Sequence, residues 1–97
     1  MKVDKPWGHE IRWAINDKYL GKILHISNGC RLSKQYHNVK DETIYVLSGV
    51  LILEIGEEEE QIILKEGESY RIEPGTIHRF CAPWDCSVKL VEVSTPE

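Results

Sequence analysis

The stretch GCRLSKQYHNVKDETIYVLSG, residues 29–49, joins a polar first half to an apolar second half. Its run Ile44–Leu47 has the β-branched and aromatic side chains that suit a buried strand. Gln35, His37 and Glu42 come shortly before this run, and polar groups are costly to bury unless a partner satisfies them. The stretch therefore predicts a core strand beside a group that binds these three side chains.

Turn signals recur along the chain roughly every 8 to 10 residues, as in Ser48-Gly49, Glu66-Gly67 and Pro74-Gly75. This spacing leaves room for strands, and no segment has the pattern of a helix. The β-rich segments are Glu10–Ala14, Lys22–Ile26, Leu32–Tyr36, Thr43–Leu47, Val50–Ile55, Gln61–Leu64, Ser69–Ile72, His78–Cys81 and Ser87–Val93. Many short strands with tight turns predict an all-β sandwich or barrel, which limits exposed sheet edges.

The segments Ile44–Leu47 and Val50–Ile55 are read as a central hairpin, and both are apolar on both faces. Both faces of these strands are therefore expected to be covered. The barrel interior covers one face. Either a second subunit or the amino-terminal strand of the same chain covers the other, and the pattern does not choose between them.

Length and composition predict one domain. The chain has 97 residues, of which 41% are hydrophobic and 29% charged, and this suffices for one compact core. We assign residues 1–97 to a single domain and residues 1–14 to an amino-terminal segment that leads into the barrel.

The formal net charge of -4 provides no basic face for a nucleic acid backbone. The chain shows neither a signal peptide nor an apolar run long enough to cross a bilayer. We therefore expect a cytoplasmic protein that binds no nucleic acid and no membrane. Cys30, Cys81 and Cys86 lack CxxC spacing and predict free thiols, and the run Glu57–Glu60 predicts a solvated loop.

Strand parity brings the polar residues of the opening stretch together. Gln35 and His37 are two residues apart, so on an extended strand they share a face, with about 7 Å between them along the backbone. The four residues 38–41 are enough to turn the chain into a hairpin, so Glu42 opens the returning strand close to His37 and shares a face with Ile44. Parity thus assigns all three polar residues to the interior, near one mouth of the barrel.

A fourth polar candidate follows a second turn. Pro74 and Gly75 suit the central positions of a type II turn, and His78 begins the strand beyond it. Two imidazoles, a carboxylate and an amide oxygen form a mixed nitrogen and oxygen ligand set for a divalent cation. The alternative is that each histidine is an ordinary hydrogen-bonded residue and Gln35 a surface amide. The two hairpins that these turns would form together favour the metal site.

The spacing Gly29-x5-Gln35-x-His37-x4-Glu42-x6-Gly49 resembles the first cupin motif. The second motif is matched by Gly67 followed by Pro74-Gly75-x2-His78. This resemblance implies a small single-domain cupin, a double-stranded β-helix or jelly-roll barrel. It also implies a metal held by Gln35, His37, Glu42 and His78, and a homodimer.

Gln35 stands where most cupins have histidine, and Gln-x-His is similar to mannose-6-phosphate isomerases, particularly the cupin domain of the type II bifunctional enzymes. Further matching segments are Lys5-Pro6-Trp7-Gly8, Leu32-Ser33, Gly67-Glu68-Ser69, Pro74-Gly75-x2-His78-Arg79 and Val91-Glu92-Val93. Lys34 and Tyr36 depart from that family, which tends to be apolar at both positions, and these 97 residues hold no nucleotidyltransferase domain.

The resemblance implies a sugar-phosphate isomerase that converts an aldose to a ketose through a metal-stabilised enediolate. Zinc is the expected metal, and manganese, cobalt, nickel or iron also suit the ligands. The partner would be a small sugar or sugar phosphate. One alternative is a metal-containing cupin that binds a small sugar or anion without turnover. Others are an iron-dependent oxygenase and a nucleotide-sugar epimerase.

Glu42, Arg79 and His25 are the candidate catalytic residues. Glu42 would act as both ligand and base. Arg79 matches the arginine that follows the second-motif histidine in isomerase-like cupins and would bind phosphate, although its parity also fits a structural ion pair. His25 would be a base or a packed structural histidine. Tyr36 has the parity of an outward-facing residue.

Overall fold

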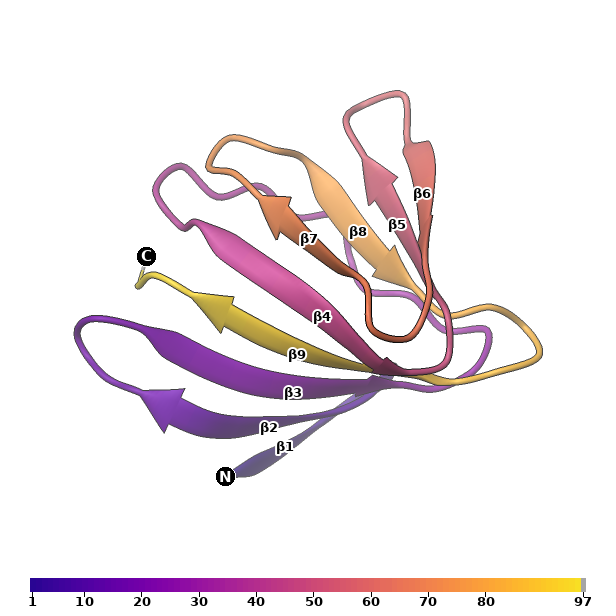
Figure 1. Ribbon diagram of the computed structural model, residues 1–97, viewed down its shortest axis with the longest axis horizontal. Helices are drawn as coiled ribbons and strands as arrows, with labels where there is room; N and C mark the ends of the chain where they lie inside the picture. The colour runs from indigo at the N-terminus through magenta and orange to yellow at the C-terminus, as the bar shows by residue number, and fades with distance from the viewer. Residues whose placement is uncertain (97) are drawn as a thin grey trace.

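The computed structural model describes residues 1–96, which form nine strands and no helix (Figure 1). The strands are β1 Lys2–Lys5, β2 Gly8–Ile15, β3 Leu20–Ile26, β4 Glu42–Ser48, β5 Leu51–Ile55, β6 Glu60–Leu64, β7 Ser69–Ile72, β8 His78–Cys81 and β9 Val88–Ser94. The prediction of an all-β chain is confirmed. Since the described part of the chain has no helix, it contains none that could span a membrane.

The strands form two antiparallel sheets. The larger sheet has the order β1-β2-β3-β9-β4-β7, and the smaller has the order β6-β5-β8. Figure 1 shows the strands converging at one end of the molecule and spreading apart at the other. We call the second end the open end. The connections 38–41 and 73–77 both lie there. Connection 73–77 runs from β7 in the larger sheet to β8 in the smaller, and connection 38–41 leads to β4 from the segment in which Gln35 bridges to His78 of β8.

The predicted central hairpin is wrong. β4 belongs to the larger sheet and β5 to the smaller, so the connection through Gly49 is a corner between sheets. Gly49 has a φ of 81°, and a Cβ there would overlap the carbonyl oxygen of Ser87. A tight turn between two apolar runs has the same sequence signature whether the strands pair or separate, which is why the pattern misled.

The predicted strand Leu32–Tyr36 is also absent as a regular strand. This segment makes only isolated bridges to β8, from Arg31 to Cys81 and from Gln35 to His78. Between these two bridges, the segment from Arg31 to Gln35 advances by four residues while β8 advances by three. The extra residue interrupts the strand pairing, as a β-bulge does. Residues 32–36 and β4 therefore do not form the hairpin that was expected, and β1 is a strand that the pattern missed.

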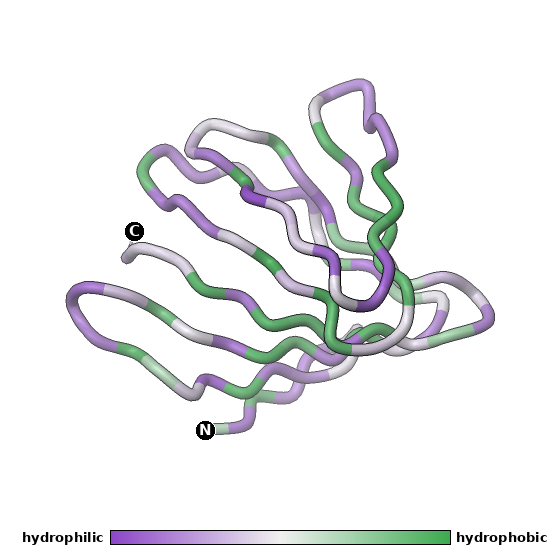
Figure 2. Tube along the Cα trace, viewed as in Figure 1, coloured by the Kyte–Doolittle hydropathy of each residue, from purple (hydrophilic) through white to green (hydrophobic). Residues whose placement is uncertain are grey.

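Side chains alternate between the interior and the outer surface of the larger sheet. Ile44 and Val46 of β4 are fully buried, whereas Tyr45 and Leu47 remain 44% and 43% exposed. Hydrophobic residues gather where the strands converge, and hydrophilic ones line the loops (Figure 2). The apolar core thus fills the converging end.

The amino-terminal strand does not cover the outer face of β4. β1 pairs with β2 at the edge of the larger sheet, so residues 1–14 are part of that sheet. Tyr45 and Leu47 consequently stay exposed in one chain. The homodimer stays a prediction.

Candidate metal centre

His37, Glu42 and His78 meet at the open end. Each offers one ligand atom, and these atoms all lie within 4.8 Å of one another. His37 precedes the 38–41 connection, Glu42 begins β4, and His78 begins β8. The two connections between the sheets, rather than two hairpins, bring the three residues together.

Backbone hydrogen bonds hold the two connections beside each other. The Gly75 N–H donates to the His37 carbonyl at 2.7 Å, and Gln35 and His78 exchange two backbone hydrogen bonds of 2.8 and 2.9 Å. Gly75 has a φ of 83°, and the Thr76 N–H donates to the Glu73 carbonyl, as the predicted type II turn requires. These hydrogen bonds fix the backbone positions of His37 and His78 relative to each other.

The environment of His78 determines which ring nitrogen faces the cluster. Its Nδ1 lies 2.9 Å from the Thr76 carbonyl oxygen, to which only a protonated nitrogen can donate. Nε2 then faces Glu42 Oε1 at 3.0 Å. A carbonyl that orients one ring nitrogen while the other faces inward is the arrangement common for metal-binding histidines.

Glu42 and His78 are both 2% exposed, so their contact is fully desolvated. Although Glu42 Oε1 and His78 Nε2 approach to 3.0 Å, neither has a partner in hydrogen-bond geometry. Buried polar atoms without hydrogen bonds are uncommon and call for a partner. A divalent cation between them satisfies both, so the residues present fit a metal ion.

The protonation states in the metal-free chain are set by the same contact. Burial opposes ionisation of Glu42, but His78 and the Lys40 charge outweigh it and hold the pKa of Glu42 below its usual range. Burial likewise acts to lower the pKa of His78, yet Glu42 and the Thr76 carbonyl raise it above its ordinary value. A cation must therefore displace a proton that the Glu42–His78 pair favours.

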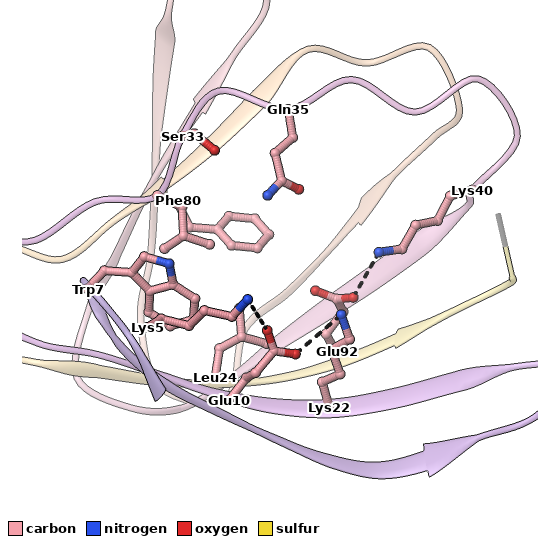
Figure 3. A pocket seen from close by; sticks show the side chains of 11 residues that line it. Lys5, Trp7, Glu10, Lys22, Leu24, Ser33, Gln35, Lys40, Phe80 and Glu92 are labelled. Atoms are coloured by element: carbon pink, nitrogen blue, oxygen red, sulfur yellow. Dashed lines mark ion pairs between the residues drawn. The ribbon is translucent and has the colours of Figure 1, made fainter. Parts of the chain in front are cut away.

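Gln35 lies beside the cluster. Its Oε1 is 3.3 Å from His37 Nε2, and its side chain points into a cavity between the sheets (Figure 3). The amide oxygen is thus close to the three predicted ligands. The structure brings all four of these residues together, as parity predicted for Gln35, His37 and Glu42 and the second turn for His78.

A buried lysine connects the cluster to a second carboxylate, and the sequence interpretation missed both residues. Lys40 Nζ lies 3.3 Å from Glu42 Oε2 and 3.2 Å from Glu92 Oε2. Lys40 is 8% exposed and Glu92 5%. Burial raises the pKa of Glu92, and although burial opposes the charge of Lys40, the two carboxylates raise its pKa. The alternation Leu90, Glu92, Ser94 could have identified Glu92 as inward-facing, whereas Lys40 looked like a turn residue.

The cavity beside the cluster has a volume of about 200 Å³. Gln35, Lys40 and Glu92 form its wall on the cluster side, and Trp7 and Phe80 contribute aromatic rings. Its remaining lining residues are Lys5, Glu10, Lys22, Leu24, Leu32 and Ser33. The interior is therefore charged and aromatic rather than uniformly apolar.

Of the three predicted catalytic residues, only Glu42 lies in the cluster. His25 follows the inward-facing Leu24 on β3 and lies on the outer face, where its ring is 5.0 Å from that of His9. Arg79 lies within 3.8 Å of Glu54 and 3.9 Å of Glu59, as in the structural ion pair that was its alternative. His25 and Arg79 are not brought to the cavity. Tyr36 is exposed, as its parity predicted.

Two facing antiparallel sheets define a small jelly-roll barrel, with the candidate metal centre at its open end. The cupin domain family matches residues 23–94. The chain belongs to the cupin family, and the family resemblance read from its two motifs is confirmed.

The matching relatives are much longer proteins. The chain is 31% identical over 94 residues to the xanthan biosynthesis protein XanB of Xanthomonas campestris, covering 97% of this chain and 20% of that protein. It is 28% identical over 95 residues to a mannose-1-phosphate guanylyltransferase of Salmonella muenchen, covering 98% of this chain and 20% of that protein. The chain thus spans about a fifth of the length of these relatives.

Among solved structures, KdgF from a Halomonas species matches with a TM-score of 0.86 and 17% sequence identity, covering 100% of this chain and 88% of that one. This likeness confirms the fold.

Proposed function

We propose that this chain is a metal-dependent aldose–ketose isomerase that acts on a hexose phosphate of the mannose 6-phosphate type. The observation that carries the proposal is the buried contact of Glu42 Oε1 with His78 Nε2, which lacks a hydrogen bond and lies beside a small charged cavity. The names of the relatives, which include a mannose-1-phosphate guanylyltransferase, support a mannose phosphate as substrate.

Zinc is the proposed metal, held by His37, Glu42, His78 and Gln35. Imidazole, carboxylate and amide oxygen donors suit zinc, and the site requires no redox change. When bound, a divalent cation supplies electrophilic stabilisation for the negative charge that develops on the sugar oxygens.

Glu92 and Lys40 carry out the proton transfers, since both line the cavity. Glu92 takes the proton from carbon 2 of the aldose and delivers it to carbon 1. The hydroxyl proton moves from oxygen 2 to oxygen 1 by way of the Lys40 ammonium group, so the substrate is rearranged without net gain or loss of atoms. In heavy water, the proton held on Glu92 exchanges with solvent in part of the turnovers, so deuterium enters carbon 1 of the ketose.

The size of the cavity supports a monosaccharide. A volume of about 200 Å³ is below the range of about 300–1,000 Å³ that is common for drug-sized ligands. A hexose phosphate suits a small cavity open at one side, whereas a nucleotide sugar is far larger.

The test is isomerisation of mannose 6-phosphate in heavy water by the zinc-loaded chain. We expect fructose 6-phosphate that carries deuterium, loss of turnover in His37→Ala, and a fall of about 10²-fold or more in Glu92→Gln. Glu58→Gln, in the exposed turn between β5 and β6, is the matched control and keeps full activity. Absence of exchange with every hexose phosphate tested contradicts the proposal.

A second candidate is a metal-containing cupin that binds a small sugar or anion without turnover. One observation favours it: Lys40 lies against both Glu42 and Glu92, so neither carboxylate is free of a cation. Saturable binding of mannose 6-phosphate to the zinc-loaded chain without deuterium exchange would select this candidate.

A further inference from the structure

The part of the cavity wall formed by β1, β2 and β3 carries a second charged group, which we call the Glu10 cluster. Glu10 is 6% exposed, and three cations surround its carboxylate. Lys5 Nζ lies at 3.5 Å, Lys22 Nζ at 3.4 Å and Arg12 Nε at 3.2 Å. Three positive charges thus meet one negative charge.

We propose that the Glu10 cluster is an anion subsite, with Lys5 as the residue that receives the phosphate group of the substrate. This inference rests on the proposed function and adds to it where the phosphate binds and which residues select for it. The phosphate role expected of Arg79 passes to this cluster, because Arg79 faces Glu54 and Glu59 instead.

The two charged groups that line the cavity differ in charge excess, although Lys22 of the second group is also the cross-strand neighbour of Glu92 in the first. In the first group, Lys40 lies between Glu42 and Glu92, so two carboxylates share one ammonium group. In the Glu10 cluster, three cations share Glu10. A substrate with hydroxyl oxygens for a cation at one end and a phosphate at the other matches this polarity.

The ammonium groups retain donors for a ligand. A lysine ammonium group has three N–H donors. The distances from Lys5 and Lys22 to Glu10 exceed the usual N–H···O range of about 2.7–3.2 Å, whereas Arg12 donates a hydrogen bond to Glu10. Arg12 holds the carboxylate in place, and the two lysines can turn toward a phosphate oxygen.

Lys5 is the accessible member of the pair. Its side chain is 34% exposed, against 22% for Lys22 and 8% for Glu10. Figure 3 shows Lys5 and Trp7 entering the cavity from the same amino-terminal segment, on the side opposite Gln35. The Trp7 indole offers an apolar face to the sugar ring, and Lys5 reaches the phosphate beyond it.

Calorimetric titration of the zinc-loaded chain tests the proposal, with mannose 6-phosphate, mannose and glucuronate as probes. Lys5→Gln should weaken mannose 6-phosphate binding by about tenfold or more, because hydrogen bonds to charged groups are the strong ones. Binding of mannose and the zinc content should stay unchanged. Lys2→Gln is the matched control, since Lys2 lies on the same strand with a side chain 61% exposed. Lys5→Arg keeps the charge and should retain tight binding.

Glucuronate separates phosphate from carboxylate recognition. Tighter binding of mannose 6-phosphate than of glucuronate supports a phosphate subsite, and the reverse order overturns it. Equal weakening of mannose and mannose 6-phosphate in Lys5→Gln also overturns it, since that result indicates a structural role.

Should Lys5→Gln fail to fold, the wild-type chain still gives an answer. Inorganic phosphate should compete with mannose 6-phosphate and not with mannose, and a lack of competition with mannose 6-phosphate contradicts the subsite. Tight binding of mannose 6-phosphate that depends on Lys5 but is not followed by isomerisation contradicts the proposed isomerase activity and supports the phosphate subsite. Isomerisation by Lys5→Gln with an unchanged KM for mannose 6-phosphate supports the isomerase activity and contradicts the phosphate subsite.

Discussion

Two pairs of histidines in this molecule have similar ring geometry and different surroundings. The rings of His37 and His78 are 5.7 Å apart and inclined at 45°, and those of His9 and His25 are 5.0 Å apart and inclined at 56°. The first pair lies beside the buried carboxylate of Glu42. The second pair lies between β2 and β3 on the outer face of the larger sheet, near Lys89.

Neighbouring groups shift the pKa of one histidine in each pair, and the two shifts have opposite directions. Despite burial, the Glu42 carboxylate raises the pKa of His78, while slight burial and the charges of His9 and Lys89 lower the pKa of His25. Proximity of two imidazoles therefore does not make a metal site. A carboxylate and desolvation are what distinguish the His37–His78 pair.

The largest expected difference between the pairs is in metal content. His78→Ala should abolish zinc retention and lower turnover by about 10³-fold or more, because it removes a ligand and leaves Glu42 buried without its neighbour. His25→Ala, the matched control, should retain both. Elemental analysis and the heavy-water assay measure the two effects, and equal zinc content in the two variants contradicts the distinction.

Gln35 should contribute less than the histidines. Gln35→Ala should weaken zinc binding by about 10–100-fold while leaving the fold intact, the effect typical of groups that orient or complete a metal site. Competition with a chelating dye measures the affinity. Tyr36→Ala, one residue away and exposed, should leave it unchanged. An unchanged affinity in Gln35→Ala excludes the amide from the site.

The Glu10 cluster should stabilise the fold at neutral pH. Burial acts to raise the pKa of Glu10, but Lys22 and Arg12 outweigh it and lower this pKa below its ordinary value of 4.5. Glu10→Gln should lower the free energy of unfolding by about 2 kcal/mol at pH 7. A carboxyl group whose pKa is lower in the folded chain stabilises the fold fully only above its pKa in the unfolded chain. The difference in unfolding free energy between the wild type and Glu10→Gln, which we call the gap, should therefore close as pH falls below 4.5. Urea denaturation at several pH values measures the gap, and a gap that widens in acid contradicts this account.

The smallest expected effect is on the outer histidine pair. His25 should titrate below its ordinary pKa of 6.5, and Lys89→Gln should move it upward by removing a nearby positive charge. The unfolded chain binds more protons at His25 in this range, so its contribution to stability declines as pH falls below 6.5. Proton NMR of the imidazole ring measures the pKa. A downward movement in Lys89→Gln contradicts the electrostatic assignment.

The sequence predicted the candidate ligands better than it predicted the path of the chain. Period-two parity correctly grouped Gln35, His37 and Glu42, because side-chain alternation holds wherever the backbone is extended. The same pattern wrongly joined Ile44–Leu47 and Val50–Ile55 into a hairpin, since turn residues do not reveal whether the chain stays in one sheet.

Local sequence patterns did not predict the positions of Lys40 and the Glu10 cluster, for a different reason. Lys5, Glu10 and Lys22 come from three different strands, and only the antiparallel register of β1, β2 and β3 brings them together. Charged residues are normally assigned to the surface, where most of them are found. Their burial follows from tertiary structure, which no local pattern encodes.

The most direct test of the central claim is a crystal structure of the protein purified without added metal, with anomalous diffraction collected at the zinc edge. The account predicts one anomalous peak, bounded by His37, Glu42 and His78 with the Gln35 amide oxygen facing it. An absent peak in protein that contains zinc by elemental analysis, or a peak between His9 and His25, would contradict it.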